Sequence, residues 1–145
     1  MPDKLKVLFL CTGNACRSQM AEAFVKKLKG DAIEAYSAGV APFRVLPETV
    51  EMMEEIGYDL SDHYAKDVHA LKKIKFDYVV TLCDHAREVC PVFPGDAKLI
   101  HHGFDDPPSL AMNAKNAEEA LGHYRRVRDE IKAFIETLPE ALENR

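Results

Sequence analysis

The residues best suited to chemistry in this sequence form one short loop, Cys11-Thr12-Gly13-Asn14-Ala15-Cys16-Arg17-Ser18. Backbone N–H groups of Thr12–Ser18, with the start of the helix expected to follow, favour a bound oxyanion. Gly13 permits a tight turn, and Arg17 offers a planar fork of donors that matches two oxygens of a tetrahedral anion. The same positive field should hold Cys11 as a thiolate, the nucleophilic form of cysteine. We therefore predict a loop that binds an oxyanion and attacks its central atom.

The sequence around the loop supports this prediction. The apolar run Val7-Leu8-Phe9-Leu10 precedes Cys11, and a helical pattern follows Arg17. A cysteine behind a buried strand is often only a small core residue. Here, however, strand, glycine, arginine and helix occur in the order that an anion-binding loop needs. A nucleophilic loop is therefore favoured over a structural cysteine.

Cys83 and Cys90 form a second pair of thiols. In a reducing compartment, cysteines are more often reactive or metal-binding than paired in structural disulfides. If residues 83–90 are helical, the two sulfurs lie about 10 Å apart, whereas a disulfide needs Cα atoms within about 7 Å. Bridging them requires the segment to unwind, which suits a redox switch; two buried core thiols are the alternative. The cysteine spacing does not favour zinc.

A candidate acid lies in Asp105-Asp106-Pro107-Pro108, directly after the last predicted strand. A carboxyl group beside an anion site is unfavourable unless it has a task. When protonated, it could donate to a leaving oxygen as a general acid. A plain Asp-Pro turn is the alternative, and the local sequence leaves both open.

Hydrophobic periodicity predicts strands alternating with helices. The expected strands are residues 5–10, 33–37, 76–82 and 97–101, and the expected helices are residues 18–29, 47–56, 67–73 and 114–137. This order predicts an α/β fold, a three-layer sandwich in which helices flank a four-stranded parallel sheet. Ligands bind beyond the carboxyl ends of such strands. Cys11 and Cys83 each follow a strand, so they are expected to approach each other.

The chain as a whole has the size of one domain, taken as residues 1–145, and its formal charge of −5 argues against a general nucleic-acid binder. No apolar run approaches the ~20 residues that cross a bilayer. Cys11 and its polar neighbours follow where a signal peptide would continue. We expect a monomeric, cytoplasmic protein without a tightly bound cofactor and without a nucleic-acid or membrane partner.

Four segments resemble a known family. They are similar to segments of the thioredoxin-coupled arsenate reductases, which share the low-molecular-weight tyrosine phosphatase fold. The matching segments are the anion loop at Phe9–Glu22, the redox segment at Val79–Pro91, the acid loop at Gly103–Pro107 and the last helix at Tyr124–Ile131. The resemblance covers nearly the whole chain. The loop alone does not separate a reductase from a phosphatase, whereas the added Cys83 and Cys90 do.

The resemblance implies a relay of three thiols that reduces arsenate to arsenite. Cys11 attacks arsenic while Arg17 holds its oxygens and Asp106 assists the departing oxygen. Cys83 then forms a disulfide with Cys11. Cys90 next attacks Cys83, which gives a Cys83–Cys90 disulfide. Thioredoxin, the implied electron donor, reduces the Cys83–Cys90 disulfide. Glutathione and glutaredoxin serve other reductases of this fold.

Some family members bind potassium through residues matching Asn14, Glu22 and Ser37 and an aspartate. In this chain Lys66 stands at the position of that aspartate. A lysine opposes a cation by charge, so we expect no metal here and an ammonium group in its place. Cys16 has no step in the relay; we expect a spectator that is open to oxidative pairing with Cys11.

Two other functions compete with the reductase. A low-molecular-weight protein tyrosine phosphatase would use Cys11, Arg17 and Asp106 through a phosphocysteine and would leave Cys83 and Cys90 idle. Phosphatases of this kind usually carry an aromatic residue after Asp-Pro, where this chain has Pro108. A thiol-based metal sensor or buffer is the non-enzymatic alternative, and no DNA-binding pattern supports it.

Overall fold

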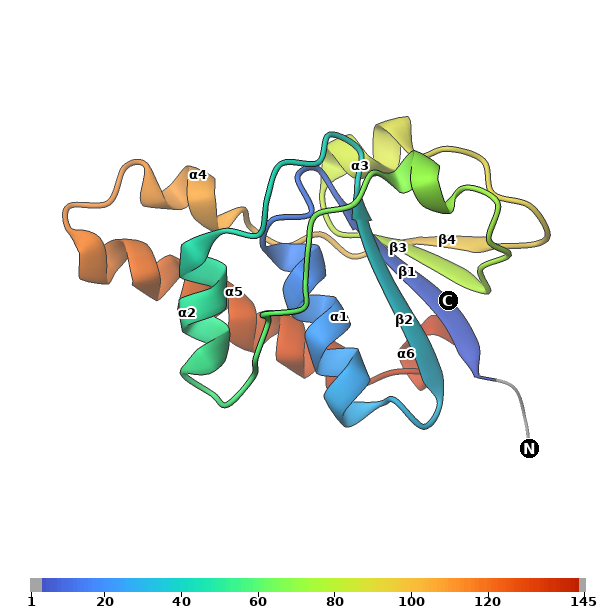
Figure 1. Ribbon diagram of the computed structural model, residues 1–145, viewed down its shortest axis with the longest axis horizontal. Coiled ribbons are helices and arrows are strands. Elements are labelled where there is room, and N and C mark those ends of the chain that lie inside the picture. Colours follow the sequence, from blue (N-terminus) through green and yellow to red (C-terminus); the bar gives the residue numbers. More distant parts are fainter. Residues whose placement is uncertain (1–3, 144–145) are drawn as a thin grey trace.

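The apolar runs of the sequence form a single parallel sheet (Figure 1). The computed structural model describes residues 4–143. Within them, β1 (Leu5–Cys11), β2 (Ile33–Gly39), β3 (Tyr78–Thr81) and β4 (Lys98–His101) lie in the order β2-β1-β3-β4. The carboxyl ends of the two central strands, β1 and β3, therefore lie next to each other.

Helices cover both faces of this sheet. Alternate residues of β1 point to opposite faces, so Val7 and Phe9 join one core and Leu8 and Leu10 the other. The first core lies under α1 (Arg17–Leu28), α2 (Pro47–Glu54) and α5 (Ala117–Glu136), and the second under the 3₁₀-helix η1 (Val68–Leu71) and α3 (Asp84–Val89). The predicted three-layer α/β sandwich is confirmed. None of the helices in residues 4–143 has the length and apolar character that a bilayer crossing requires.

Several element boundaries differ from the prediction because of local contacts. Sheet pairing in β3 begins at Tyr78 rather than residue 76, and the Phe76 ring packs edge-on against Phe93. The predicted helix 67–73 is only the short η1. Helix α5 begins at Ala117, where the Asn116 side chain accepts the N–H of Glu119 and caps it.

Two short helices were not predicted. Pro107 occupies the first turn of α4 (Pro107–Ala111), a position where its missing N–H costs nothing, so the expected stiff loop is a helix start. The second is α6 (Glu140–Glu143). The ends of the predicted domain, residues 1–3 and 144–145, lie outside the described residues.

Candidate active site

The loop after β1 has the geometry of an oxyanion cradle. Hydrogen bonds from the segment after β2 hold the loop carbonyls: Ala41, Phe43 and Leu46 donate their N–H groups to Thr12, Gly13 and Ala15. With the carbonyls engaged there, the N–H groups of the loop are left for an anion. In the described structure no side chain caps α1 at Cys16, so the first N–H groups of that helix are also available.

The tight turn of the loop does not depend on Gly13, which corrects our prediction. The left-handed residue is Asn14, with φ of 50°, a conformation that asparagine tolerates better than most residues. The close backbone approach is at Gly39 instead. A Cβ atom there would lie 2.5 Å from the Thr12 carbonyl oxygen and 2.9 Å from the Asn14 nitrogen. The end of β2 thus presses against the loop where only glycine fits.

The predicted nucleophile and cation of the site are both buried. The Cys11 Sγ atom lies 2.9 Å from the Ser18 hydroxyl oxygen. Arg17 is only 8% exposed; its Nη1 donates to the Phe104 carbonyl over 2.9 Å, and its Nη2 lies 3.3 Å from Asp106 Oδ1. The guanidinium therefore connects the loop to the segment that carries the predicted acid.

Asp106 lies beside the loop, as the acid role requires. Its other carboxylate oxygen accepts the Ser109 hydroxyl over 2.6 Å, a contact that the sequence analysis missed. Ser109 stands on the first turn of α4, three residues after Asp106, so the missed helix is the reason for the omission. The segment is therefore not a plain turn, because Asp106 begins α4 and contacts Arg17, and its role as an acid stays a prediction.

Cys83 opens into the same pocket as Arg17 and Asp106. This pocket has a volume of about 390 Å³. The Sγ atom of Cys83 lies 3.3 Å from the Thr12 hydroxyl oxygen and accepts the Ala86 N–H at the start of α3. Cys83 therefore lies at the anion loop, beside the residue that follows Cys11, which agrees with the predicted approach of the two cysteines.

Cys90 lies at the other end of α3 from Cys83. Its thiol is partly buried, donates to the Pro91 carbonyl over 3.5 Å, and has a raised pKa because of burial. All four cysteines are free. Since residues 84–89 are helical, a bond between Cys83 and Cys90 requires α3 to unwind, as the sequence predicts.

Cys16 packs into the first core and differs from the other thiols. Burial is the main reason why its pKa is raised to about 12, and a hydrogen bond with Thr49 only partly opposes this. A thiol that stays protonated near neutral pH is a poor nucleophile. The oxidative pairing with Cys11 that we expected is therefore disfavoured.

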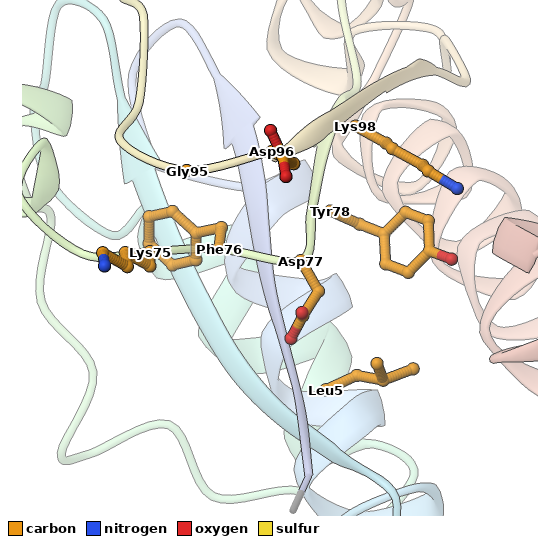
Figure 2. A pocket seen from close by; sticks show the side chains of 8 residues that line it. All are labelled: Leu5, Lys75, Phe76, Asp77, Tyr78, Gly95, Asp96 and Lys98. Atoms are coloured by element: carbon orange, nitrogen blue, oxygen red, sulfur yellow. The ribbon is translucent and has the colours of Figure 1, made fainter.

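A second pocket lies at the other end of the strands, where β1 and β3 begin (Figure 2). Its volume is about 400 Å³, and Leu5 and Tyr78, the first residues of β1 and β3, help to line it. Lysine and aspartate side chains alternate around it, and its lining includes no cysteine. This pocket therefore offers no thiol to a bound molecule.

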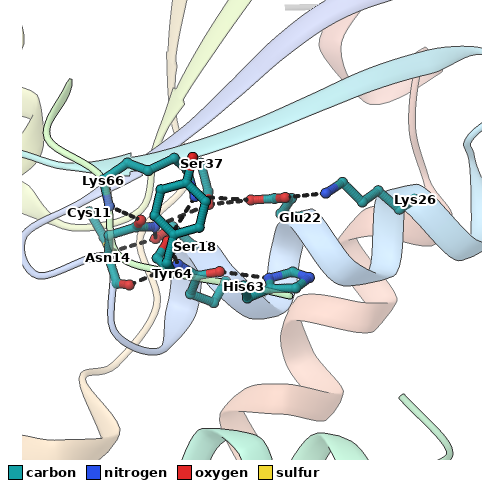
Figure 3. Close-up of polar contacts among 10 residues, drawn as sticks. Cys11, Asn14, Ser18, Glu22, Lys26, Ser37, His63, Tyr64 and Lys66 are labelled. Carbon is teal, nitrogen blue, oxygen red and sulfur yellow. Dashed lines mark hydrogen bonds and ion pairs between the residues drawn. The ribbon is translucent and has the colours of Figure 1, made fainter. Parts of the chain in front are cut away.

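Behind the loop lies a buried polar cluster (Figure 3). Glu22, 6% exposed, is in contact with the ammonium of Lys26 and with the Ser37 hydroxyl, and Lys66 Nζ lies 3.9 Å from its Oε1. Its charge is therefore already balanced by two ammonium groups. In residues 4–143 no cluster of His, Cys, Asp and Glu side chains suits a metal. The residues present do not fit a potassium ion.

Exchange of sodium for potassium should consequently leave this protein unchanged. We expect the melting temperature to be the same in NaCl and KCl at about 100 mM, since only an ion that binds the folded state raises stability, by RT ln(1 + [ion]/Kd). Scanning fluorimetry over a potassium series measures this directly. A potassium-specific rise in melting temperature would show that the cluster accommodates the cation after all.

Gln19 and His63, which were not among the predicted site residues, support the loop from behind. The Gln19 Nε2 atom donates to the carbonyls of Asn14 and Tyr64, each over 3.0 Å, and its Oε1 lies 2.7 Å from His63 Nδ1. Because Oε1 can only accept, Nδ1 of His63 carries the proton. The available signal was a glutamine directly after the loop motif, on the face of α1 that becomes buried.

Comparison with known proteins agrees with this geometry. Residues 6–145 match the family model described as "Low molecular weight phosphotyrosine protein phosphatase". A relative from Halalkalibacterium halodurans, named "Arsenate reductase", is 46% identical over 138 residues, which cover 95% of this chain and 97% of the relative. A solved structure described as "An arsenate reductase in oxidized state" has a TM-score of 0.76 and 30% identity, covering 92% of this chain and 95% of that one.

Two further structures represent the competing functions. A thioredoxin-dependent arsenate reductase of Corynebacterium glutamicum has a TM-score of 0.68 and 26% identity, covering 97% of this chain but 62% of that one. A low molecular weight protein tyrosine phosphatase from T. tengcongensis has a TM-score of 0.72 and 32% identity, covering 95% and 99%. The matches thus include both chemistries on one fold. The resemblance is confirmed at the level of fold and family: this chain belongs to the low molecular weight phosphotyrosine protein phosphatase family.

Proposed function

We propose that this chain is an arsenate reductase that works through Cys11, Cys83 and Cys90. The observation that carries the proposal is the second thiol in the anion pocket. Cys83 lines the pocket together with Arg17 and Asp106, and its sulfur lies 3.3 Å from the Thr12 hydroxyl. A phosphatase has no use for a thiol at this place. The arsenate reductase from Halalkalibacterium halodurans, alike over nearly its whole length, supports the same choice.

In the first step the Cys11 thiolate attacks the arsenic of arsenate. The fork of Arg17 and the N–H groups of the loop bind the arsenate oxygens. An S–As bond forms while one As–O bond breaks, and Asp106 gives its proton to the departing oxygen, which leaves as water. For the substrate to bind, the Arg17 guanidinium must contact the arsenate oxygens as well as Asp106, its present partner.

In the second step Cys83 attacks the sulfur of Cys11. The S–S bond forms as the S–As bond breaks, and the electron pair of the broken bond remains on arsenic. Arsenic is thereby reduced from the +5 to the +3 state and leaves as arsenite, while the two thiols are oxidised to a disulfide. Cys11 lies at the end of β1 and Cys83 follows the neighbouring strand β3, so this step needs no large movement of the sheet.

In the third step Cys90 attacks Cys83 and releases Cys11 as a thiolate. The product is a Cys83–Cys90 disulfide, which a dithiol protein of the thioredoxin class reduces through a mixed disulfide. Burial raises the pKa of Cys90, so its thiolate fraction increases when α3 unwinds and exposes it to water. The thioredoxin-dependent enzyme of Corynebacterium glutamicum supports this donor.

Phosphate ester hydrolysis is a second candidate activity. The loop, Arg17 and Asp106 would serve a phosphocysteine intermediate in the same way, and the phosphatase from T. tengcongensis is 32% identical to this chain. We expect weak hydrolysis of aryl phosphates beside the reductase reaction.

A coupled assay tests the proposal. The protein is mixed with thioredoxin, thioredoxin reductase and NADPH, and arsenate is then added. We expect sustained NADPH oxidation that requires arsenate and stops without thioredoxin, with arsenite formed in equal amount. Steady hydrolysis of an aryl phosphate without any arsenate-dependent oxidation would contradict the reductase and leave the phosphatase.

A further inference from the structure

A chain of buried side chains connects the Cys11 thiol to the carboxylate of Glu22 (Figure 3). Asn14, Ser18 and Ser37 are each fully buried. The Asn14 Nδ2 atom lies 2.7 Å from Ser18 Oγ and 3.1 Å from Ser37 Oγ, and the Ser37 hydroxyl is in contact with Glu22 Oε1. Cys11 and Glu22 therefore lie at opposite ends of one hydrogen-bonded chain.

The direction of each hydrogen bond in this chain follows from its neighbours. An ionised carboxylate can only accept, so Ser37 gives its one proton to Glu22 and can itself only accept from Asn14. The Lys66 backbone N–H donates to Asn14 Oδ1 over 2.8 Å. This contact fixes the amide so that its NH₂ group faces both serines.

The same logic settles the contact at the nucleophile. Ser18 accepts a hydrogen bond from the Asn14 amide, so its own hydroxyl proton is free to point at the Cys11 sulfur, 2.9 Å away. A sulfur that accepts such a bond is stabilised as a thiolate. The arrangement thus provides the nucleophile with a donor whose orientation is set several residues away.

We infer that Glu22 is a positioning residue for the reaction: its charge orients Ser37 and Asn14, and through them it commits Ser18 to donate to the Cys11 thiolate. This inference extends the proposed function, because it explains how the attacking thiolate is kept available. Glu22 remains ionised in its buried place. Burial opposes ionisation, but hydrogen bonds from Lys26 and Ser37 and the charges of Lys26 and Lys66 outweigh it and lower the pKa of Glu22.

Lys66 contacts both Glu22 and Asn14. Its ammonium faces Glu22 and donates to the Tyr64 carbonyl over 2.8 Å, while its backbone N–H holds Asn14. The charged groups around Glu22 are Lys26 on the same helix and Lys66 on the segment before η1. The titratable His63 lies on that segment too, and burial lowers its pKa, which favours the neutral imidazole. Without the carboxylate, the Lys66 ammonium would be left half-buried and unpaired, and its hold on Asn14 would loosen.

Glu22→Gln gives opposite expectations for the two ways in which Glu22 could act. If Glu22 acted only through its charge, losing a negative charge would favour a nearby thiolate and move the pH midpoint of Cys11 alkylation down. If Glu22 positions the hydrogen-bonded side chains, the pH midpoint of Cys11 alkylation moves up by about one unit. At pH values below the midpoint, the variant then holds about tenfold less Cys11 thiolate than the wild type. The sign of the shift therefore decides between the two.

The measurement is the rate of Cys11 alkylation by iodoacetamide against pH, with mass spectrometry to separate Cys11 from the other cysteines. Glu34→Gln is the matched control, since it removes the same charge from an exposed position on the strand that carries Ser37. We expect an upward shift in Glu22→Gln and none in Glu34→Gln. A downward shift, or none, in folded Glu22→Gln overturns the inference.

Ser37→Ala keeps the inference testable if Glu22→Gln does not fold. It changes no charge, so a purely electrostatic role predicts no effect, whereas the positioning role again predicts an upward shift. An unchanged midpoint in Ser37→Ala overturns the inference. Because the assay needs neither arsenate nor thioredoxin, its result is independent of whether the reductase assignment holds.

Discussion

Cys90→Ser should turn this protein into an enzyme that reduces arsenate only once. The first two steps need only Cys11 of the anion loop and Cys83, which lines the pocket beside that loop, so arsenite should form in a burst of about one equivalent per protein. The Cys11–Cys83 disulfide then persists, because no third thiol releases Cys11. Sustained NADPH oxidation in the coupled assay should fall by at least about a hundredfold. Rapid quench with arsenite detection measures the burst.

The variant carries its own control. Aryl phosphate hydrolysis should be unchanged in reduced Cys90→Ser, since Cys90 lies at the far end of α3 from the anion pocket. The trapped disulfide should appear as a loss of two hydrogen atoms, about 2 Da, which peptide mapping assigns to Cys11 and Cys83. Multiple turnovers at the wild-type rate would show that the relay does not use Cys90.

Arg17→Lys should impair both activities together. Lysine keeps the charge but not the planar fork, and the fork contacts the Phe104 carbonyl and the Asp106 carboxylate at once. Loss of one such donor to a developing oxyanion costs about 10²–10³ in rate. We therefore expect kcat/KM for arsenate and for an aryl phosphate to fall by about this factor.

Arg87→Lys is the matched control for Arg17→Lys. Arg87 lies on α3 near Cys83, where its guanidinium makes only an exposed contact with Asp84, 3.5 Å away. Exposed pairs of this kind contribute little, so the control should keep wild-type kinetics. Steady-state kinetics with both substrates decide the matter. If Arg17→Lys stays within a few-fold of wild type, the fork does not bind the substrate oxygens.

The arrangement of strands was predictable because parallel sheets constrain their neighbours strongly. Apolar runs separated by helical patterns suffice to place Cys11 and Cys83 at the same edge, and both residues lie there. The nucleophilic loop was predictable for a similar reason, since its residues are contiguous. The contact of Arg17 with the acid loop, in contrast, needed the tertiary structure.

The support behind the loop was not predictable from sequence patterns. Gln19 and His63 are far apart along the chain, and nothing local indicates that their side chains meet. Glycine is the usual residue at a left-handed turn, so the sequence predicts the turn at Gly13, whereas Asn14 has the left-handed conformation. Arg128 interrupts the apolar stripe of α5, and only the fold shows that Glu55 and the Met52 carbonyl satisfy it.

The shortness of α3 has a consequence for the energetics of turnover. A helix of six residues makes few internal hydrogen bonds, and such short helices are marginal in water without tertiary support. Of its residues only Ala86 is buried, so little apolar surface is exposed when it opens. We therefore expect a low local unfolding free energy for this segment. In the proposed relay, the sheet that holds Cys11 can then stay folded while α3 melts and re-forms.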